Sequence, residues 1–279
     1  MLIFSDDPAT HTRIAAEFSV EQRPGNPHRL LIILSPNNRH PLRRTDFGCD
    51  VLSVAEVRAG GYFIRHAGQL AEALAGFVRA HDYAEVAVFG MSKGAAGALN
   101  IGRLMAPLGD RVIHVLAFSP QTQLYPPNPD LAFPTYRALL KEAEDDRELR
   151  QALEAHGDIP PLDHPRLRAC IIYGERNPTD AAEALRVAGP SARFLALPMA
   201  DHRSVIPFLC DPGDPDAVHA VLYQLMEKSR DEVDVAKLLR PEVMERLELD
   251  MAAFPPDRRP PSLPEFIDRF VRTSRTPGP

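Results

Sequence analysis

The chain of 279 residues contains few cysteines and no long apolar segment. Cys49, Cys170 and Cys210 are widely spaced and odd in number, so they fit neither a disulfide framework nor a zinc-binding motif. We expect them to be small core residues in a reducing compartment. No apolar run reaches the roughly 18 residues that a membrane-spanning helix needs. The sequence therefore predicts a protein without disulfides, a metal site or a membrane span.

The chain also lacks an excess of positive charge and the pattern of a secretory signal. Its formal net charge is −6, which argues against a general nucleic-acid-binding surface. The first residues, MLIFSDDP, contain no basic start, long apolar segment or cleavage site. We therefore expect a cytoplasmic protein that does not act on nucleic acid.

Proline is unusually frequent, with 28 residues, about twice the usual share. The segment AAFPPDRRPPSLPEF cannot form a continuous helix or a central strand, because proline lacks a backbone donor and restricts the residue before it. We interpret residues 229–279 as a partly helical extension that packs on its own domain. The alternative is an arm that grips another subunit and makes a homo-oligomer.

Short apolar strands alternate with helices through the middle of the chain. This alternation predicts an α/β fold over residues 1–228, with a mostly parallel sheet and helices on both faces. The expected strands are residues 29–35, 49–56, 85–90, 111–119, 168–175 and 192–199, and the expected helices are 66–83, 93–105 and 179–189.

A stretch of 47 residues between Ser119 and Leu167 interrupts this alternation. Apolar residues at helical spacing predict one helix over residues 134–156. Long insertions in compact domains are often lids or binding loops, so we interpret residues 120–166 as a small helical cap over an active site. An ordinary excursion between strands is the alternative.

The motif GMSKG, residues 90–94, has the G-x-S-x-G pattern of a nucleophile elbow. It lies between an apolar strand and a helix rich in small residues, and this is the context in which the pattern indicates a nucleophile elbow. A serine at a helix N-terminus is near free N–H groups and the positive end of the helix dipole. We therefore expect Ser92 to be the nucleophile; the alternative is a glycine-rich turn with a passive serine.

A serine nucleophile needs a general base that an acid orients, and in this arrangement the chain order is serine, acid, histidine. His202 follows the last apolar strand in a polar loop and is the expected base, with His219 as the second candidate. Many enzymes with this arrangement place the acid three residues after the glycine that ends the preceding strand. Asn177 occupies that position here, but it is not a carboxylate. We expect Asp180 to be the acid, with Glu175 as the alternative. Asp180 could instead cap the following helix.

Together, FGMSKG, YGERNPTD and MADHRS make residues 29–227 resemble an α/β-hydrolase. The resemblance implies Ser92 as nucleophile, Asp180 as orienting acid and His202 as base. The motif is also similar to the G-x-S-K-G of some acyl-CoA thioesterases and acyltransferases, and to hydrolase-like proteins associated with surface-glycan modification.

An α/β-hydrolase also needs two N–H groups that stabilise the oxyanion. The backbone of Lys93, the residue after the serine, is expected to supply one of them. The loop SPNNRH should supply the other from Asn37 or Asn38, because Pro36 has no N–H; a plain polar turn is the alternative for either asparagine.

The same loop continues with a basic run, which would favour an anionic acyl substrate if the run bordered the pocket. Alternatively, these basic side chains lie on a solvated surface away from the pocket. The basic residues are Arg39, His40, Arg43 and Arg44.

The sequence predicts a serine hydrolase that cleaves a small-molecule ester or thioester through an acyl-enzyme, without a metal or an organic cofactor. An acyltransferase with the same triad, acting on a glycan or a CoA-borne acyl group, is the first alternative. A non-catalytic binding protein of the same fold is the second.

Overall fold

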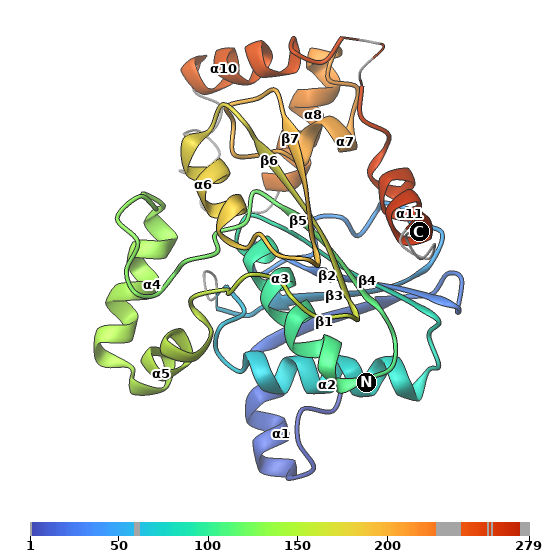
Figure 1. Cartoon of the computed structure of the whole chain (residues 1–279), viewed down its shortest axis with the longest axis vertical. Coiled ribbons are helices and arrows are strands. Elements are labelled where there is room, and N and C mark those ends of the chain that lie inside the picture. Colours follow the sequence, from blue (N-terminus) through green and yellow to red (C-terminus); the bar gives the residue numbers. More distant parts are fainter. Residues whose placement is uncertain (1, 59–61, 227–240, 256, 258, 274–279) are drawn as a thin grey trace.

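The computed structural model describes residues 2–58, 62–226, 241–255, 257 and 259–273. Seven strands form a sheet with the order β1-β3-β2-β4-β5-β6-β7 (Figure 1). Only β1 pairs antiparallel, with β3; all other neighbours are parallel. This confirms the predicted mostly parallel α/β fold. The strands are β1 Phe18–Arg23, β2 Arg29–Leu34, β3 Asp50–Glu56, β4 Glu85–Met91, β5 Ile113–Phe118, β6 Leu167–Gly174 and β7 Ala192–Leu197.

The central strands are buried on both faces, which explains why they read as continuous apolar runs. Successive side chains of a strand enter two different cores, as the period of two requires. In β2, for example, Leu30 and Ile32 pack into one apolar cluster, whereas Leu31 and Ile33 pack into another.

Helices cover both faces of this sheet. Four of them, α1, α2, α3 and α6, place buried side chains or adjoining apolar residues in the first cluster, and α7, α8, α10 and α11 do so in the second. The first set is α1 Pro8–Ala15, α2 Ala67–Ala80, α3 Lys93–Met105 and α6 Pro178–Arg186; the second is α7 Ile206–Leu209, α8 Pro215–Met226, α10 Pro241–Met251 and α11 Leu263–Thr273. A short 3-10 helix, η1 Ala106–Leu108, follows α3.

The predicted single helix over residues 134–156 is wrong, because the chain forms two helices, α4 Pro134–Asp145 and α5 Arg147–His156. The break occurs at Asp146, which has extended dihedral angles (φ −107°, ψ 102°). Its side chain accepts a hydrogen bond from the N–H of Leu149, at 2.9 Å, and so caps α5. Aspartate favours such a cap over a helix interior, which explains the break.

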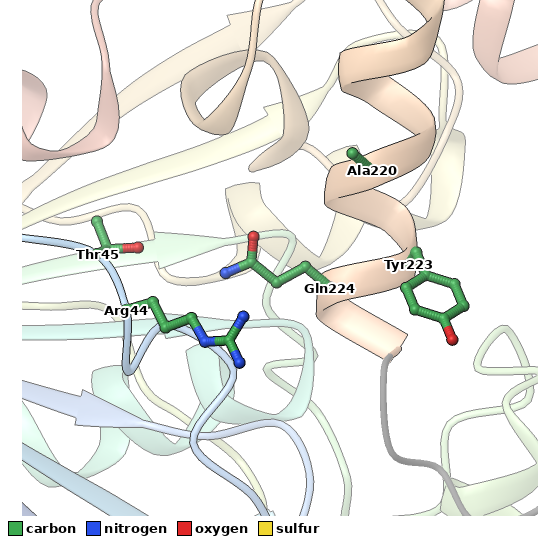
Figure 2. A pocket seen from close by; sticks show the side chains of 5 residues that line it. All are labelled: Arg44, Thr45, Ala220, Tyr223 and Gln224. Atoms are coloured by element: carbon green, nitrogen blue, oxygen red, sulfur yellow. The ribbon is translucent and has the colours of Figure 1, made fainter.

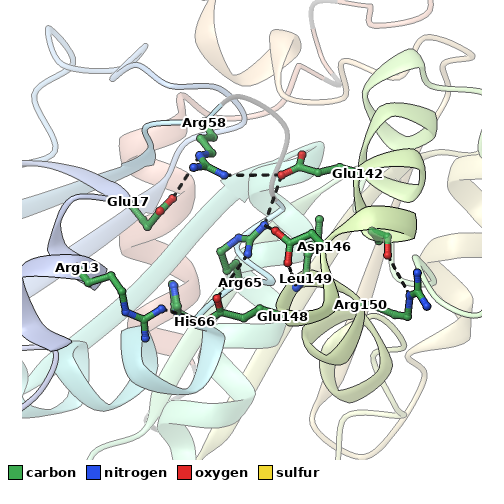
Figure 3. Close-up of polar contacts among 11 residues, drawn as sticks. Arg13, Glu17, Arg58, Arg65, His66, Glu142, Asp146, Glu148, Leu149 and Arg150 are labelled. Carbon is green, nitrogen blue, oxygen red and sulfur yellow. Dashed lines mark hydrogen bonds and ion pairs between the residues drawn. The ribbon is translucent and has the colours of Figure 1, made fainter.

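Charged contacts attach these two helices to the body of the protein (Figure 3). Arg65, which precedes α2, pairs with Asp146 at 2.7 Å and with Glu142 at 3.4 Å. Arg13 of α1 pairs with Glu148 at 3.2 Å. An apolar cluster that includes side chains from both helices lies beside these charges. The role of residues 120–166 as a cap stays a prediction.

The N-terminal elements α1 and β1 had no counterpart among the predicted elements. In β1 a single strand residue, Phe18, is buried, so the strand lacks an apolar pattern that would reveal it. Residues 229–240 of the expected C-terminal extension lie outside the described residues, whereas α10 and α11 pack on the second face of the sheet. An intersubunit role for the extension stays a prediction.

The three cysteines are free thiols. Burial raises the pKa of each of them to about 11, so each thiol stays protonated at neutral pH and is a poor nucleophile. No helix among the described residues has the length and apolar character to cross a membrane.

Candidate active site

Ser92 lies in a sharp turn between β4 and α3 and has an unusual backbone conformation, with φ 52° and ψ −121°. Two glycines make this turn possible. A Cβ at Gly90 would overlap the carbonyl of Gly94, and a Cβ at Gly94 would overlap the carbonyl of Leu34. The N–H of Ser92 donates to the carbonyl of Phe118 at 2.8 Å, which ties the turn to β5. The serine is therefore held in a strained position at the carboxyl edge of the sheet.

The structure brings Ser92, His202 and Asp180 together in a chain of hydrogen bonds. Nε2 of His202 lies 2.9 Å from Oγ of Ser92, and Nδ1 lies 2.7 Å from Oδ1 of Asp180. With the proton on Nδ1, His202 donates to the carboxylate and its Nε2 accepts from the serine hydroxyl. The side chain of His202 is 20% exposed and that of Asp180 is 3% exposed, so the carboxylate is shielded from water while the imidazole is partly accessible.

Asp180 is the third residue of α6 and does not cap that helix, so the capping alternative is wrong. The N-cap is Asn177, whose Oδ1 accepts from the N–H of Asp180 at 3.1 Å. Glu175, the alternative acid, is exposed, and its N–H extends the ladder to Leu197 of β7. The carboxylate of Asp180 therefore remains free to meet His202.

Polar contacts also hold the loop that carries His202. The carboxylate of Asp201 accepts from the N–H, Nε and Nη2 of Arg203. Oγ of Ser204 lies 2.8 Å from Oγ of Ser119, at the end of β5. His219, the second candidate base, is on α8 with Nε2 3.9 Å from Glu248, and its half-exposed side chain has no bond to Ser92.

Two residues of the insertion contact this group, and sequence reasoning missed both. Nε2 of Gln121 donates to Oγ of Ser92 at 3.3 Å, and Gln121 is 2% exposed. The ring of Phe133 lies against that of His202, with the centroids 4.8 Å apart. No motif marks either residue; their position in the insertion that we interpreted as a cap was the available signal.

The two expected oxyanion donors differ in their surroundings. Lys93 is the first residue of α3, so its N–H has no partner within the helix. Asn37 lines a small cleft together with Lys93, whereas Asn38 is exposed and does not line it. Oδ1 of Asn37 accepts from the N–H of Arg39 at 3.1 Å, so the asparagine also stabilises its own turn. The role of either asparagine as the second donor stays a prediction.

The cleft is also lined by Glu56 and Lys93, which are both partly buried. Burial raises the pKa of Glu56 to about 7. Burial likewise lowers the pKa of Lys93, and the nearby charge of Glu56 partly opposes that shift. Nζ of Lys93 lies 5.9 Å from the centroid of the Tyr62 ring. The cleft therefore holds the partly desolvated amino group of the residue that follows Ser92 in the sequence.

The basic run after Asn38 does not line this cleft. His40 bonds through Nδ1 to Oγ of Ser53, at 2.7 Å, on the sheet. Arg44 lies at a separate open pocket of about 400 Å³ against α8, together with Tyr223 and Gln224 (Figure 2). The expected preference for an anionic substrate gains no support from these positions and stays a prediction.

Among the described residues, no group of three or more His, Cys, Asp or Glu side chains could hold a metal ion. The chemistry available at the described site is that of a hydroxyl, an imidazole, a carboxylate and backbone N–H groups. Such a set suits proton transfer coupled to nucleophilic attack.

No protein-family model matches the chain, and no curated protein matches it. Similar solved structures include a prolyl endopeptidase (14% identity over 83% of this chain, TM-score 0.44), of which this chain spans only 39%. Acetyl xylan esterase 1 from Thermoanaerobacterium sp. is 16% identical, with 76% of this chain and 80% of that chain covered and a TM-score of 0.46. The type II thioesterase BorB from the borrelidin biosynthetic cluster is 19% identical, with 75% and 96% covered and a TM-score of 0.40.

Identities and TM-scores this low say nothing about the substrate of this chain. Its own architecture is more informative. The sheet is mostly parallel, the strained serine turn joins β4 to α3, and Asp180 and His202 follow β6 and β7. This arrangement gives the chain the α/β-hydrolase fold.

Proposed function

We propose that this protein is a serine hydrolase that cleaves an ester or thioester of a small molecule through an acyl-enzyme. The observation that carries the proposal is the pair of short contacts at His202, 2.9 Å to the hydroxyl of Ser92 and 2.7 Å to the carboxylate of Asp180. A base within hydrogen-bond reach of a hydroxyl, itself oriented by an acid, is the arrangement that activates a serine.

In the first step, Oγ of Ser92 attacks the acyl carbon while Nε2 of His202 takes the hydroxyl proton. Asp180 accepts the Nδ1–H and stabilises the imidazolium that forms. The carbon becomes tetrahedral, and its oxygen carries the negative charge. The imidazolium then gives its proton to the departing alcohol or thiol, which leaves Ser92 acylated.

The developing oxyanion needs donors that are already in place. The N–H of Lys93 supplies one, and Asn37 supplies the other from the loop that follows β2. The N-terminus of α3 adds the positive end of its dipole. Removing one such donor lowers kcat by about 10²–10³-fold in a well-studied serine protease.

In the second step, His202 takes a proton from water as the water attacks the acyl carbon. A second tetrahedral intermediate collapses, the proton returns to Oγ of Ser92, and the carboxylic acid leaves. If the hydroxyl of an acceptor molecule replaces water, the same residues transfer the acyl group instead of hydrolysing it.

A fluorophosphonate probe tests the nucleophile. We expect the probe to label the wild-type protein at Ser92, as mass spectrometry of the modified peptide will show, and we expect no labelling of Ser92→Ala. Ser19→Ala is a control, because Ser19 is an exposed serine on β1 and, within the described part of the chain, has no contact with Ser92 or with the loop that carries His202. This control should still be labelled. Labelling of Ser92→Ala would disprove the assignment.

A panel of acyl esters and acyl-CoA thioesters tests the reaction, with and without added alcohols and sugars. If the free acid is released at the same rate with and without the added alcohols and sugars, the result supports hydrolysis. Transfer of the acyl group to the added hydroxyl at the expense of the free acid would make the protein an acyltransferase. A wild-type protein that neither turns over any substrate nor reacts with the probe would be a binding protein of the same fold.

A further inference from the structure

A carboxylate from the C-terminal part of the chain is buried beneath the loop that carries His202. Asp250 belongs to the last turn of α10 and is 2% exposed. Its Oδ2 accepts hydrogen bonds from the backbone N–H groups of Ala200, at 2.9 Å, and Asp201, at 2.6 Å. Its Oδ1 pairs with Arg176 at 2.9 Å. One side chain thus joins the loops that follow β6 and β7.

The position of Asp250 is unfavourable for its own helix. A negative charge in the last turn meets the negative end of the helix dipole, and burial removes the carboxylate from water. The contacts that offset these costs all lie outside α10, in the two loops. The structure therefore gives Asp250 a function in the loops rather than in the helix.

The loop backbone just before His202 is held from two sides. Asp250 accepts from the N–H of Ala200, and Nδ2 of Asn177 donates to the carbonyl of the same residue at 3.1 Å. Both peptide groups of Ala200 are therefore fixed, two residues before the imidazole. Since His202 must meet Ser92 and Asp180 at once, a small shift of this backbone would break one of the two contacts.

We propose that Asp250 is a positioning residue for His202. Through this side chain, α10 holds the loop that places the imidazole, although the helix contributes no reacting group. The inference rests on the proposed function. The alternative is that Asp250 only attaches α10 to the domain. The two can be separated because α10 is also attached by apolar side chains, among them Leu247, which is fully buried.

The experiment compares Asp250→Ala and Asp250→Leu, which both remove the acceptor of the loop N–H groups, with two matched controls on the same helix. Leu247→Ala loosens the packing of α10 but leaves the loop hydrogen bonds in place. Glu248→Gln removes an exposed carboxylate two positions before Asp250. For each variant, the labelling rate of Ser92 by the fluorophosphonate probe, kcat, KM and Tm are measured per folded protein.

We expect both Asp250 variants to lower kcat and the labelling rate by about 10²-fold, the loss that a misplacement of about 1 Å can cause, with KM little changed. Leu247→Ala should lower Tm while both rates stay within a few-fold of wild type, and Glu248→Gln should resemble wild type. Rates for the Asp250 variants that fall no further than those of Leu247→Ala would overturn the proposal. If Asp250→Ala does not fold, the near-isosteric Asp250→Leu, which also removes both acceptor oxygens, decides.

A second readout does not depend on catalysis. A proton on Nδ1 of His202 that is bonded to Asp180 should give a low-field NMR resonance, and the Asp250 variants should lose it while Leu247→Ala retains it. A wild-type protein that the probe does not label would contradict the proposed function but leave this readout usable. Retention of the resonance in both Asp250 variants would refute the positioning role.

Discussion

The ring of Phe133 lies against the imidazole ring of His202, with their planes inclined by 46°. Phe133 immediately precedes α4, so the insertion places an apolar surface directly beside the proposed base. Phe133→Ala should lower kcat/KM for esters with apolar acyl groups by roughly 2- to 10-fold, because an aromatic contact is worth about 0.5–1.5 kcal/mol beyond its area. Steady-state kinetics over a series of acyl lengths measures this effect. Phe133→Tyr, which keeps the ring, is the control, and equal activity of the alanine variant on all esters would contradict the prediction.

Asp180→Asn should lower kcat by up to about 10⁴-fold, because the amide favours the wrong imidazole tautomer. Its Tm should change little, since Asn177 rather than Asp180 caps α6. Glu175→Gln is the matched control at an exposed position and should keep wild-type activity. Activity assays with thermal denaturation of the same samples test both statements. Collapse of Glu175→Gln with an active Asp180→Asn would reverse the assignment.

Moving the carboxylate to position 177 should not restore an inactive Asp180→Asn variant. Nδ2 of Asn177 bonds to the carbonyl of Ala200 rather than to His202, so Asn177→Asp would place a second acceptor against that carbonyl. Aspartate and asparagine cap helices about equally well, so the double variant should remain folded. Its kcat should be no higher than that of Asp180→Asn. Recovery of turnover would show that position 177 can reach the base.

The glycines of the serine turn should be intolerant of a methyl group. Gly94→Ala forces a Cβ against the carbonyl of Leu34 and should lower the free energy of unfolding by at least about 1–3 kcal/mol. Gly76→Ala is the matched control in α2, where the nearest contact of the added Cβ is Nη2 of Arg79 at 3.9 Å. That change should stabilise the protein by about 0.5–1 kcal/mol. Urea denaturation of both variants gives the comparison.

Stability should depend on pH through Glu56. Its pKa in the folded protein is raised to about 7 from an ordinary value of 4.5, so the folded state retains a proton that the unfolded state has released between these values. The contribution of Glu56 to the free energy of unfolding therefore falls as pH rises from about 4.5 to 7. Glu56→Gln should be more stabilising, relative to wild type, at pH 8 than at pH 5.

Denaturation at the two pH values checks this dependence. Glu72→Gln, which removes an exposed carboxylate on α2, should show a much smaller difference between them. A Glu56→Gln effect that is equal at both pH values would contradict the prediction.

The parts of the site that follow regular elements could be predicted from the sequence. Ser92 is marked by a strand, two glycines and a helix, and the predicted parallel α/β sheet is confirmed. Asp180 and His202 follow successive strands of that sheet, so their meeting at one edge follows from the topology. Their catalytic roles remain the proposal made above.

The remaining contacts depend on packing between segments that no local pattern connects. Asp250 bonds to Ala200 across 50 residues, and nothing in the sequence of α10 distinguishes this carboxylate from its exposed neighbour Glu248. The break at Asp146 depends on a cap that competes with a helix of good amphipathic spacing. β1 could not be predicted, because only its first residue is buried and the strand therefore has no apolar pattern.

His202, the proposed base, lies in the loop that follows β7, an edge strand of the sheet in which one residue, Leu197, is buried. Edge elements with few buried contacts open at a lower free energy than the core of a domain. We therefore expect the imidazole to separate from Ser92 while β2, β4 and β5 remain paired. In a denaturant titration, enzymatic activity should consequently disappear at a lower concentration than the circular dichroism signal of the sheet, so that loss of activity would report the opening of this edge before the domain unfolds.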